Sequence, residues 1–286
     1  MLIKPFFADA NANYEAADFV IYGAPFDGTS SFRAGARNAP AEVRRASYNF
    51  ETYMHEYKLD LESVKICDLG DLEVSSSVDE TLELVQKCTQ RIANDNKIPI
   101  MLGGEHSLSY ACIKSFKQIA AIIFDAHLDL RKRYLGVKFS HACVSHHIVK
   151  YVGRENYVAI GIRSGTKEEY NFADKNLRYY SAEQISASGI ENIIKEVLEY
   201  LKPENIYLSI DFDVLDPAFA PAVSTPEPFG LSSRELRRAI RMLAPRAVGF
   251  DIVEIAPDYD RGETALLGAK LVREFIAARS YHGKSI

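Results

Sequence analysis

The chain has 286 residues, of which 47% are hydrophobic, and a formal net charge of −5. This length and apolar content suffice for a large buried core, and we expect a single α/β domain over residues 1–286. The acidic balance gives no reason to expect a nucleic-acid partner, and the apolar runs are too short to span a membrane.

Apolar runs alternate with helical patterns along the chain. The runs typical of buried strands are residues 19–22, 64–67, 98–102, 120–124, 157–162, 206–210 and 247–253. Helices are predicted from about residue 41 and over 77–94, 191–201, 232–244 and 264–281, with capping-box sequences at Ser77 and Ser232. Such alternation predicts right-handed βαβ units, and hence an α/β fold of three layers, αβα, around a mainly parallel sheet.

Acidic and histidine side chains gather where three of the predicted strands end. The segments are Gly103-Gly104-Glu105-His106, Asp125-Ala126-His127-Leu128-Asp129 and Asp211-Phe212-Asp213. In open α/β sheets, ligands bind at the carboxyl ends of the strands. One such segment alone is typical of a solvated turn, but the three together favour a binding site.

The charge of these segments predicts metal binding. Four carboxylates in one cleft, those of Asp125, Asp129, Asp211 and Asp213, repel one another and take up protons unless cations neutralise them. Two divalent ions would provide that charge. Mixed carboxylate and imidazole ligands suit Mn²⁺ first, with Zn²⁺, Fe²⁺ and Co²⁺ as alternatives.

Cysteine use and the first residues indicate the compartment. The four cysteines are scattered without C-x-x-C spacing, which is typical of reduced thiols rather than of a disulfide framework. Residues 1–7 lack the longer apolar core and the cleavage site of a signal peptide. We therefore expect a cytoplasmic protein.

The acidic motifs resemble those of the arginase and agmatinase ureohydrolases. The similarity rests on residues 103–107, 125–129, 209–217 and 220–221, and on outer segments 25–28, 32–37 and 251–257 that lean toward agmatinase. It covers nearly the whole chain and implies an arginase-like fold and a homo-oligomer, either a trimer or a hexamer. The chain departs from the family pattern at Glu105, where many members have aspartate, and at residues 222–224, where a glycine-rich turn is commoner.

The resemblance also implies roles for particular residues. One Mn²⁺ would be held by His106, Asp125, Asp129 and Asp211, and the other by Asp125, His127, Asp211 and Asp213. His141 would be the proton shuttle and Glu254 the partner of the substrate guanidinium, with Thr225 near the metals and Asp216 supporting a loop. A purely structural role stays open for His141, as it does for His146 and His147.

The implied reaction is hydrolysis of a guanidino carbon–nitrogen bond. Two adjacent ions acidify water for attack on the guanidinium carbon. We expect agmatine as the small-molecule guanidino substrate, with putrescine and urea as products. The alternatives within the same chemistry are arginine, guanidinobutyrate, aminopropylagmatine and formiminoglutamate. A noncatalytic metal-binding or assembly protein is the remaining alternative, because a motif does not prove turnover.

Residues 130–140 bear on the choice among these substrates. Arginases use small polar residues in this loop to hold the α-amino and α-carboxylate groups of arginine, whereas this loop is apolar, aromatic and basic. Arginine is therefore expected to be a poor substrate. The cations Arg131, Lys132 and Arg133 are predicted to point to water. The alternative is that one of them turns inward to pair with the carboxylate of 4-guanidinobutyrate.

Overall fold

Within residues 6–282, the part of the chain that the computed structural model describes, eight strands form one sheet. The strands are β1 Phe19–Ala24, β4 Ile66–Asp71, β5 Ile98–Gly103, β6 Ala120–Phe124, β7 Tyr157–Ile162, β8 Arg178–Ser181, β9 Ile206–Asp211 and β10 Ala247–Val253. Their order is β4-β1-β5-β10-β9-β6-β7-β8, and each neighbouring pair is parallel. The prediction that residues 1–7 are not a signal peptide falls partly outside the described residues, because these begin at residue 6.

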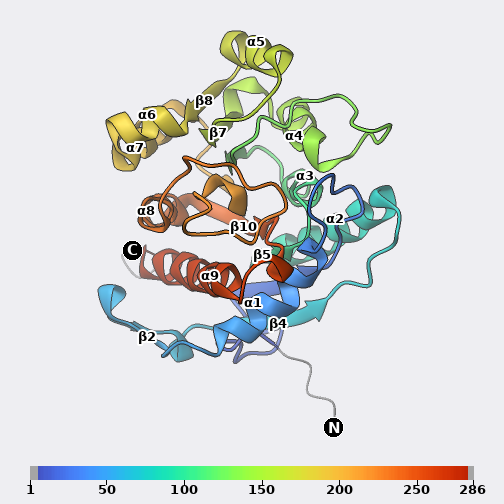
Figure 1. Cartoon of the computed structure of the whole chain (residues 1–286). Coiled ribbons are helices and arrows are strands. Elements are labelled where there is room, and N and C mark those ends of the chain that lie inside the picture. Colours follow the sequence, from blue (N-terminus) through green and yellow to red (C-terminus); the bar gives the residue numbers. More distant parts are fainter. Residues whose placement is uncertain (1–5, 283–286) are drawn as a thin grey trace.

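Helices cover both faces of the sheet (Figure 1). They are α1 Ala39–Ser47, α2 Val78–Asn94, α3 Ser107–Lys114, α4 Val144–Val152, α5 Lys167–Asn176, α6 Ala182–Ser188, α7 Ile190–Tyr200, α8 Ser233–Leu243 and α9 Glu263–His282. One apolar core contains residues of α1, α6, α7, α8 and α9, and a second contains residues of α2, α3, α4 and α5. The fold is therefore the three-layer αβα architecture that the sequence predicts. No helix in the described range is both long and apolar enough to cross a membrane.

The strands serve both cores at once, which explains their continuous apolar runs. In β6, Ala120, Ile122 and Phe124 belong to the first core, whereas Ala121 and Ile123 belong to the second. Successive side chains of a strand point to opposite faces, so a strand covered on both sides is apolar at every position. All five residues of β6 are fully buried.

The seven predicted strands are confirmed, and β6, β7 and β10 have the predicted bounds. Strand β8 was not predicted because this edge strand, Arg-Tyr-Tyr-Ser, has only one buried residue, Tyr180. The short hairpin of β2 Tyr53–Met54 and β3 Leu59–Asp60 was not predicted either. The capping box of α8 is present, but at α2 Ser77 caps the helix while the Glu80 carboxylate bonds Ser75 instead.

The strand order creates the cleft that the sequence analysis expects. Strands β5 and β6 are consecutive in the chain, yet β10 and β9 lie between them in the sheet. The connections on the two sides of this crossover diverge, and a crevice forms at the carboxyl ends of the central strands. The chain segments that follow β5, β6, β9 and β10 therefore meet at one place.

Close packing of the turn after β5 fixes one wall of this crevice. The Glu105 N–H donates to the Phe26 carbonyl over 2.8 Å, and the Glu254 N–H donates to the Gly104 carbonyl over 2.8 Å. A Cβ atom on Gly104 would lie 1.8 Å from the Phe26 carbonyl oxygen. Because that obstacle is backbone, only glycine fits here without moving the loop after β1.

We predict that Gly104→Ala lowers the free energy of unfolding by about 3 kcal/mol, the upper end of the usual cost of overpacking. Gly136→Ala is the control, since a Cβ atom there meets nothing within 4 Å and the variant carries only the cost of a positive φ in a turn, about 1 kcal/mol. Denaturant unfolding of both variants measures the difference. Equal losses would contradict a specific clash at Gly104.

Candidate metal centre

Backbone amides hold three of the predicted ligands and orient them toward one another. Asp125 Oδ1 accepts from the His127 N–H over 2.6 Å, and Asp211 Oδ1 accepts from the Asp213 N–H over 2.9 Å. Asp213 Oδ1 accepts in turn from the Ala126 N–H over 3.0 Å. Each carboxylate thus has one oxygen fixed by the main chain, and the other faces the cluster.

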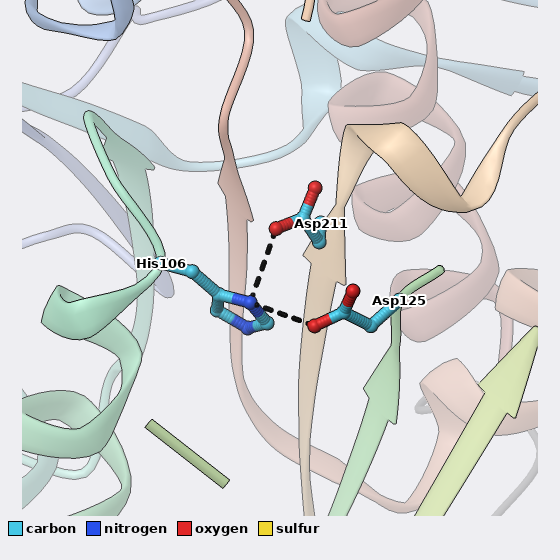
Figure 2. A group of neighbouring side chains, drawn as sticks. All are labelled: His106, Asp125 and Asp211. Atoms are coloured by element: carbon cyan, nitrogen blue, oxygen red, sulfur yellow. Dashed lines mark ion pairs between the residues drawn. The ribbon is translucent and has the colours of Figure 1, made fainter. Parts of the chain in front are cut away.

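The free oxygens meet two histidines. Figure 2 shows His106, which follows β5, between Asp125 and Asp211, with its Nδ1 atom 3.1 Å from an Oδ2 atom of each. Asp129 Oδ2 lies 3.8 Å from the same nitrogen. On the other side of Asp125, His127 Nδ1 lies 2.9 Å from Asp213 Oδ2 and 3.6 Å from Asp125 Oδ1. Two potential ligand groups, His106-Asp125-Asp211 and Asp125-His127-Asp213, therefore share Asp125.

The tautomer of His106 indicates that this cluster needs a cation. His106 Nε2 lies 3.2 Å from the Ser209 hydroxyl, which donates to Asp251 Oδ1 over 2.7 Å. The hydroxyl therefore accepts the Nε2 proton, and the Nδ1 lone pair faces two carboxylate oxygens. His106 Nδ1 and Asp125 Oδ2 are buried and have no hydrogen-bond partner.

A proton or a metal ion between these atoms would remove the repulsion. Adjacent ligand atoms at about 2.1 Å from one ion lie about 3 Å apart, which agrees with the 3.1 Å separations around His106 Nδ1.

The pKa values of the cluster residues also favour binding of a cation. Burial and the charges of neighbouring aspartates raise the pKa values of Asp129 and Asp211 well above the usual range. Although burial opposes it, Asp125 and Asp211 raise the pKa of His106 as well. Without a metal the cluster retains protons, and bound cations would displace them.

A cavity of about 300 Å³ opens beside the cluster. His127, Asp129, Asp211, Asp213, Thr225, His141 and Glu254 line it. Glu254 accepts from the His106 N–H over 2.7 Å, and burial raises the pKa of Glu254 to about 7. Asp129 and Glu254 have positive φ values of 48° and 63°. Such backbone conformations cost energy in residues other than glycine and cluster at functional sites.

Of His141, His146 and His147, only His141 lines this cavity. It belongs to the turn His141–Cys143, and its ring meets Tyr134 edge-on with centroids 5.7 Å apart. Burial lowers the pKa of His141. His147 instead places its Nε2 atom 2.9 Å from the Lys138 carbonyl oxygen and packs against Phe139. His146 does not line the cavity either.

Thr225 and Asp216 lie in different surroundings. The Thr225 hydroxyl donates to Asp213 Oδ2 over 3.1 Å, which brings it next to the cluster. Asp216 does not line the cavity but accepts from three backbone N–H groups, those of Ala218, Phe229 and Gly230. Its carboxylate thus closes the loop that follows β9.

The basic loop differs from expectation at Arg131. Lys132 and Arg133 are exposed, as expected. Arg131 instead lines the cavity, with its Nε atom 3.7 Å from Glu169 Oε2 and its guanidinium 4.5 Å from the centroid of the Tyr134 ring. The aromatic face and the buried carboxylate hold this cation at the wall of the cavity.

Several residues near the site were not predicted from the sequence. Thr29 and Ser31 contact His141, and they stand in the family-like N-terminal region, although no motif singled them out. Ser209 and Asp251 support His106 from within segments that the resemblance covers. Glu169 could not be found as a cavity residue, because its only local signal is the capping box that begins at Thr166.

The parallel sheet, and the acids and histidines at its carboxyl edge, are the features of a ureohydrolase. The family model described as "Arginase family" matches residues 17–278, and the chain belongs to this family. The chain is 39% identical to the N(1)-aminopropylagmatine ureohydrolase of Thermococcus kodakarensis over 94% of its own length and 93% of that protein. It is 37% identical to the agmatinase of Pyrococcus horikoshii, over 90% of each chain.

A solved structure extends this similarity to the fold. The crystal structure of the agmatine ureohydrolase of Thermoplasma volcanium matches with a TM-score of 0.96 and 41% identity. The match covers all of this chain, 100%, and 97% of the other. The sequence-based recognition of the family and the arginase-like fold are thereby confirmed.

Proposed function

We propose that this ureohydrolase cleaves the guanidino carbon–nitrogen bond of agmatine to give urea and putrescine. The observation that carries the proposal is the pair of ligand groups sharing Asp125, at the wall of a cavity that Glu254 and His141 also line. The names of the relatives, agmatinase and aminopropylagmatine ureohydrolase, support the substrate class. We further propose a single domain over residues 1–286, in a cytoplasmic trimer or hexamer.

Two Mn²⁺ ions complete the proposed site. One would be held by His106, Asp125, Asp129 and Asp211, and the other by Asp125, His127, Asp211 and Asp213. When bound, the ions would supply Lewis acidity that activates water for attack on the guanidinium carbon. Oxygen and imidazole donors without sulfur suit Mn²⁺.

Glu254 and His141 act on the substrate in this proposal. The Glu254 carboxylate faces the cavity and pairs with the planar guanidinium, which can donate two parallel hydrogen bonds to it. His141 takes up a proton released by the attacking water and passes it to the leaving nitrogen as the carbon–nitrogen bond breaks. Its lowered pKa keeps the ring neutral and able to accept that proton near neutral pH.

The outer wall of the cavity determines which chemical group the substrate can carry at the end away from its guanidinium. Arg131 is the cation there, and the buried Glu169 carboxylate partly balances its charge. This pairing favours agmatine, whose cationic amine would otherwise meet an uncompensated guanidinium. The presence of Arg131 at the cavity also supports a second candidate substrate, 4-guanidinobutyrate, whose carboxylate it could bind in place of Glu169.

The metal assignment predicts that Asp211→Asn weakens Mn²⁺ binding by at least about 100-fold, because even loss of a residue supporting a ligand costs 10–100-fold. Urea release should fall with it. Elemental analysis after desalting measures the bound metal, and Asp79→Asn, at an exposed acid of α2, is the matched control. Two full equivalents of metal in an active Asp211→Asn enzyme would remove the assignment.

The shuttle assignment predicts that His141→Asn lowers kcat by about 10²–10⁴-fold while leaving the metal content near normal. His146→Asn, at a histidine outside the cavity, is the control and should retain kcat. Both are measured by urea release and elemental analysis. Metal loss equal to that of Asp211→Asn would make His141 a ligand or a structural support instead.

The substrate assignment predicts a higher kcat/KM for agmatine than for arginine, because Glu169 already pairs with Arg131, the cation at the cavity wall. A carboxylate left without a partner costs about 1–3 kcal/mol to bury. The assay is urea formation from a Mn²⁺-loaded enzyme with agmatine, aminopropylagmatine, arginine and 4-guanidinobutyrate. Arg131→Gln should lower kcat/KM for 4-guanidinobutyrate relative to that for agmatine. Lys132→Gln, at an exposed site, should leave this ratio unchanged.

A clear preference for 4-guanidinobutyrate would overturn agmatine as the substrate and leave the metal chemistry intact. Absence of urea from every compound, in a protein that holds two metal equivalents, would favour the noncatalytic alternative.

A further inference from the structure

A threonine from the loop after β1 lies between a buried acid and the proposed shuttle histidine. The Thr29 hydroxyl oxygen is 2.6 Å from Glu105 Oε1 and 3.2 Å from His141 Nδ1. It also accepts the backbone N–H of His141 over 3.0 Å. The Thr29 hydroxyl therefore contacts both the backbone and the ring of His141.

As a carboxylate, Glu105 only accepts hydrogen bonds in this arrangement. Its Oε1 atom receives the hydroxyls of Thr29 and Ser107, each over 2.6 Å, and its Oε2 atom receives the Thr29 N–H over 2.7 Å. The side chain is fully buried. Oxygen separations of 2.5–2.7 Å are typical of a hydroxyl that donates to a carboxylate. The single hydroxyl proton of Thr29 is thereby directed to Glu105.

This direction determines which nitrogen of His141 carries the proton. With its own proton on Glu105, the Thr29 oxygen can only accept from the ring, so His141 Nδ1 is the donor. A neutral imidazole protonated at Nδ1 has its lone pair on Nε2. That atom lies 3.3 Å from the hydroxyl of Ser31, a residue that lines the cavity. The Ser140 hydroxyl, 3.3 Å from Nδ1, is a second and more distant neighbour of the protonated nitrogen.

We propose that Glu105, acting through Thr29, is a positioning device that fixes the Nδ1-protonated tautomer of His141 and leaves Nε2 to exchange protons in the cavity. This inference rests on the proposed function of His141. Neither Glu105 nor Thr29 lines the cavity, so both act through the histidine. The length of the acid matters, because a side chain one methylene shorter would withdraw the carboxylate from the Thr29 hydroxyl.

Thr29→Val tests the proposal, since valine has nearly the same shape and lacks the hydroxyl. Losing the partner that fixes a catalytic histidine costs up to about 10⁴-fold in kcat elsewhere, and a hydroxyl is a weaker anchor than a carboxylate. We expect kcat for urea release to fall at least about 10-fold, with KM and bound Mn²⁺ within twofold of the wild type. Thr29→Ser restores the hydroxyl and should recover kcat to within about threefold.

Two further variants separate positioning from a general structural effect. Thr81→Val removes a buried threonine hydroxyl from α2, outside the cavity, and should keep the wild-type kcat. In the double variant Thr29→Val/His141→Asn, the threonine change should cause no further loss beyond that of His141→Asn. Non-additivity of this kind is expected only when one residue acts through the other.

The outcomes distinguish this inference from the proposed function. Wild-type kcat in Thr29→Val would overturn the positioning role while leaving His141 as the shuttle. So would a double variant in which Thr29→Val lowers kcat by as large a factor as it does in the wild type. An unchanged kcat in His141→Asn would instead reject the shuttle itself. If Thr29→Val does not fold, Glu105→Asp gives the same test, and full kcat in that variant with normal metal content would overturn the inference.

Discussion

Mutual repulsion among buried carboxylates is the constraint on which the rest of this structure depends. Asp125, Asp211 and Asp213 each accept a backbone N–H with one oxygen, and the other oxygen faces His106 or His127. That arrangement holds only because the main chain is rigid at the ends of β6 and β9, which two apolar cores clamp from both faces. The scaffold thus holds several carboxylates close together, and bound cations would relieve their repulsion.

The supports of the two central histidines follow one design. His106 donates to Ser209, whose hydroxyl donates to Asp251. His141 contacts Thr29, whose hydroxyl donates to Glu105. In each case a hydroxyl lies between an imidazole and a buried acid, and its single proton selects the tautomer. In His106 the nitrogen left with a lone pair, Nδ1, faces two carboxylates. In His141 the corresponding nitrogen is Nε2, which is left to exchange protons in the cavity.

Local sequence predicted the parts of this protein whose causes are local. The run at 120–124 specified a doubly covered strand, and the acids directly after it followed as candidate ligands. Arg131, Thr29 and Glu169 could not be assigned in this way, because their positions depend on loops that approach from distant parts of the chain. Edge strand β8 was not predicted because it pairs with only one strand of the sheet, β7, and shows little apolar pattern.

The central place of β10 has a consequence for synthesis on the ribosome. This strand is the last of the sheet in chain order, yet it pairs with β5 on one side and with β9 on the other. The two halves of the sheet cannot join until it has left the exit tunnel, and such late, non-local pairing makes folding slow. Strands β6 and β9 can pair before then, so the acids that follow them can meet early, but His106, which follows β5, stays apart from them. The group His106-Asp125-Asp211 would therefore be complete only after β10 has been released.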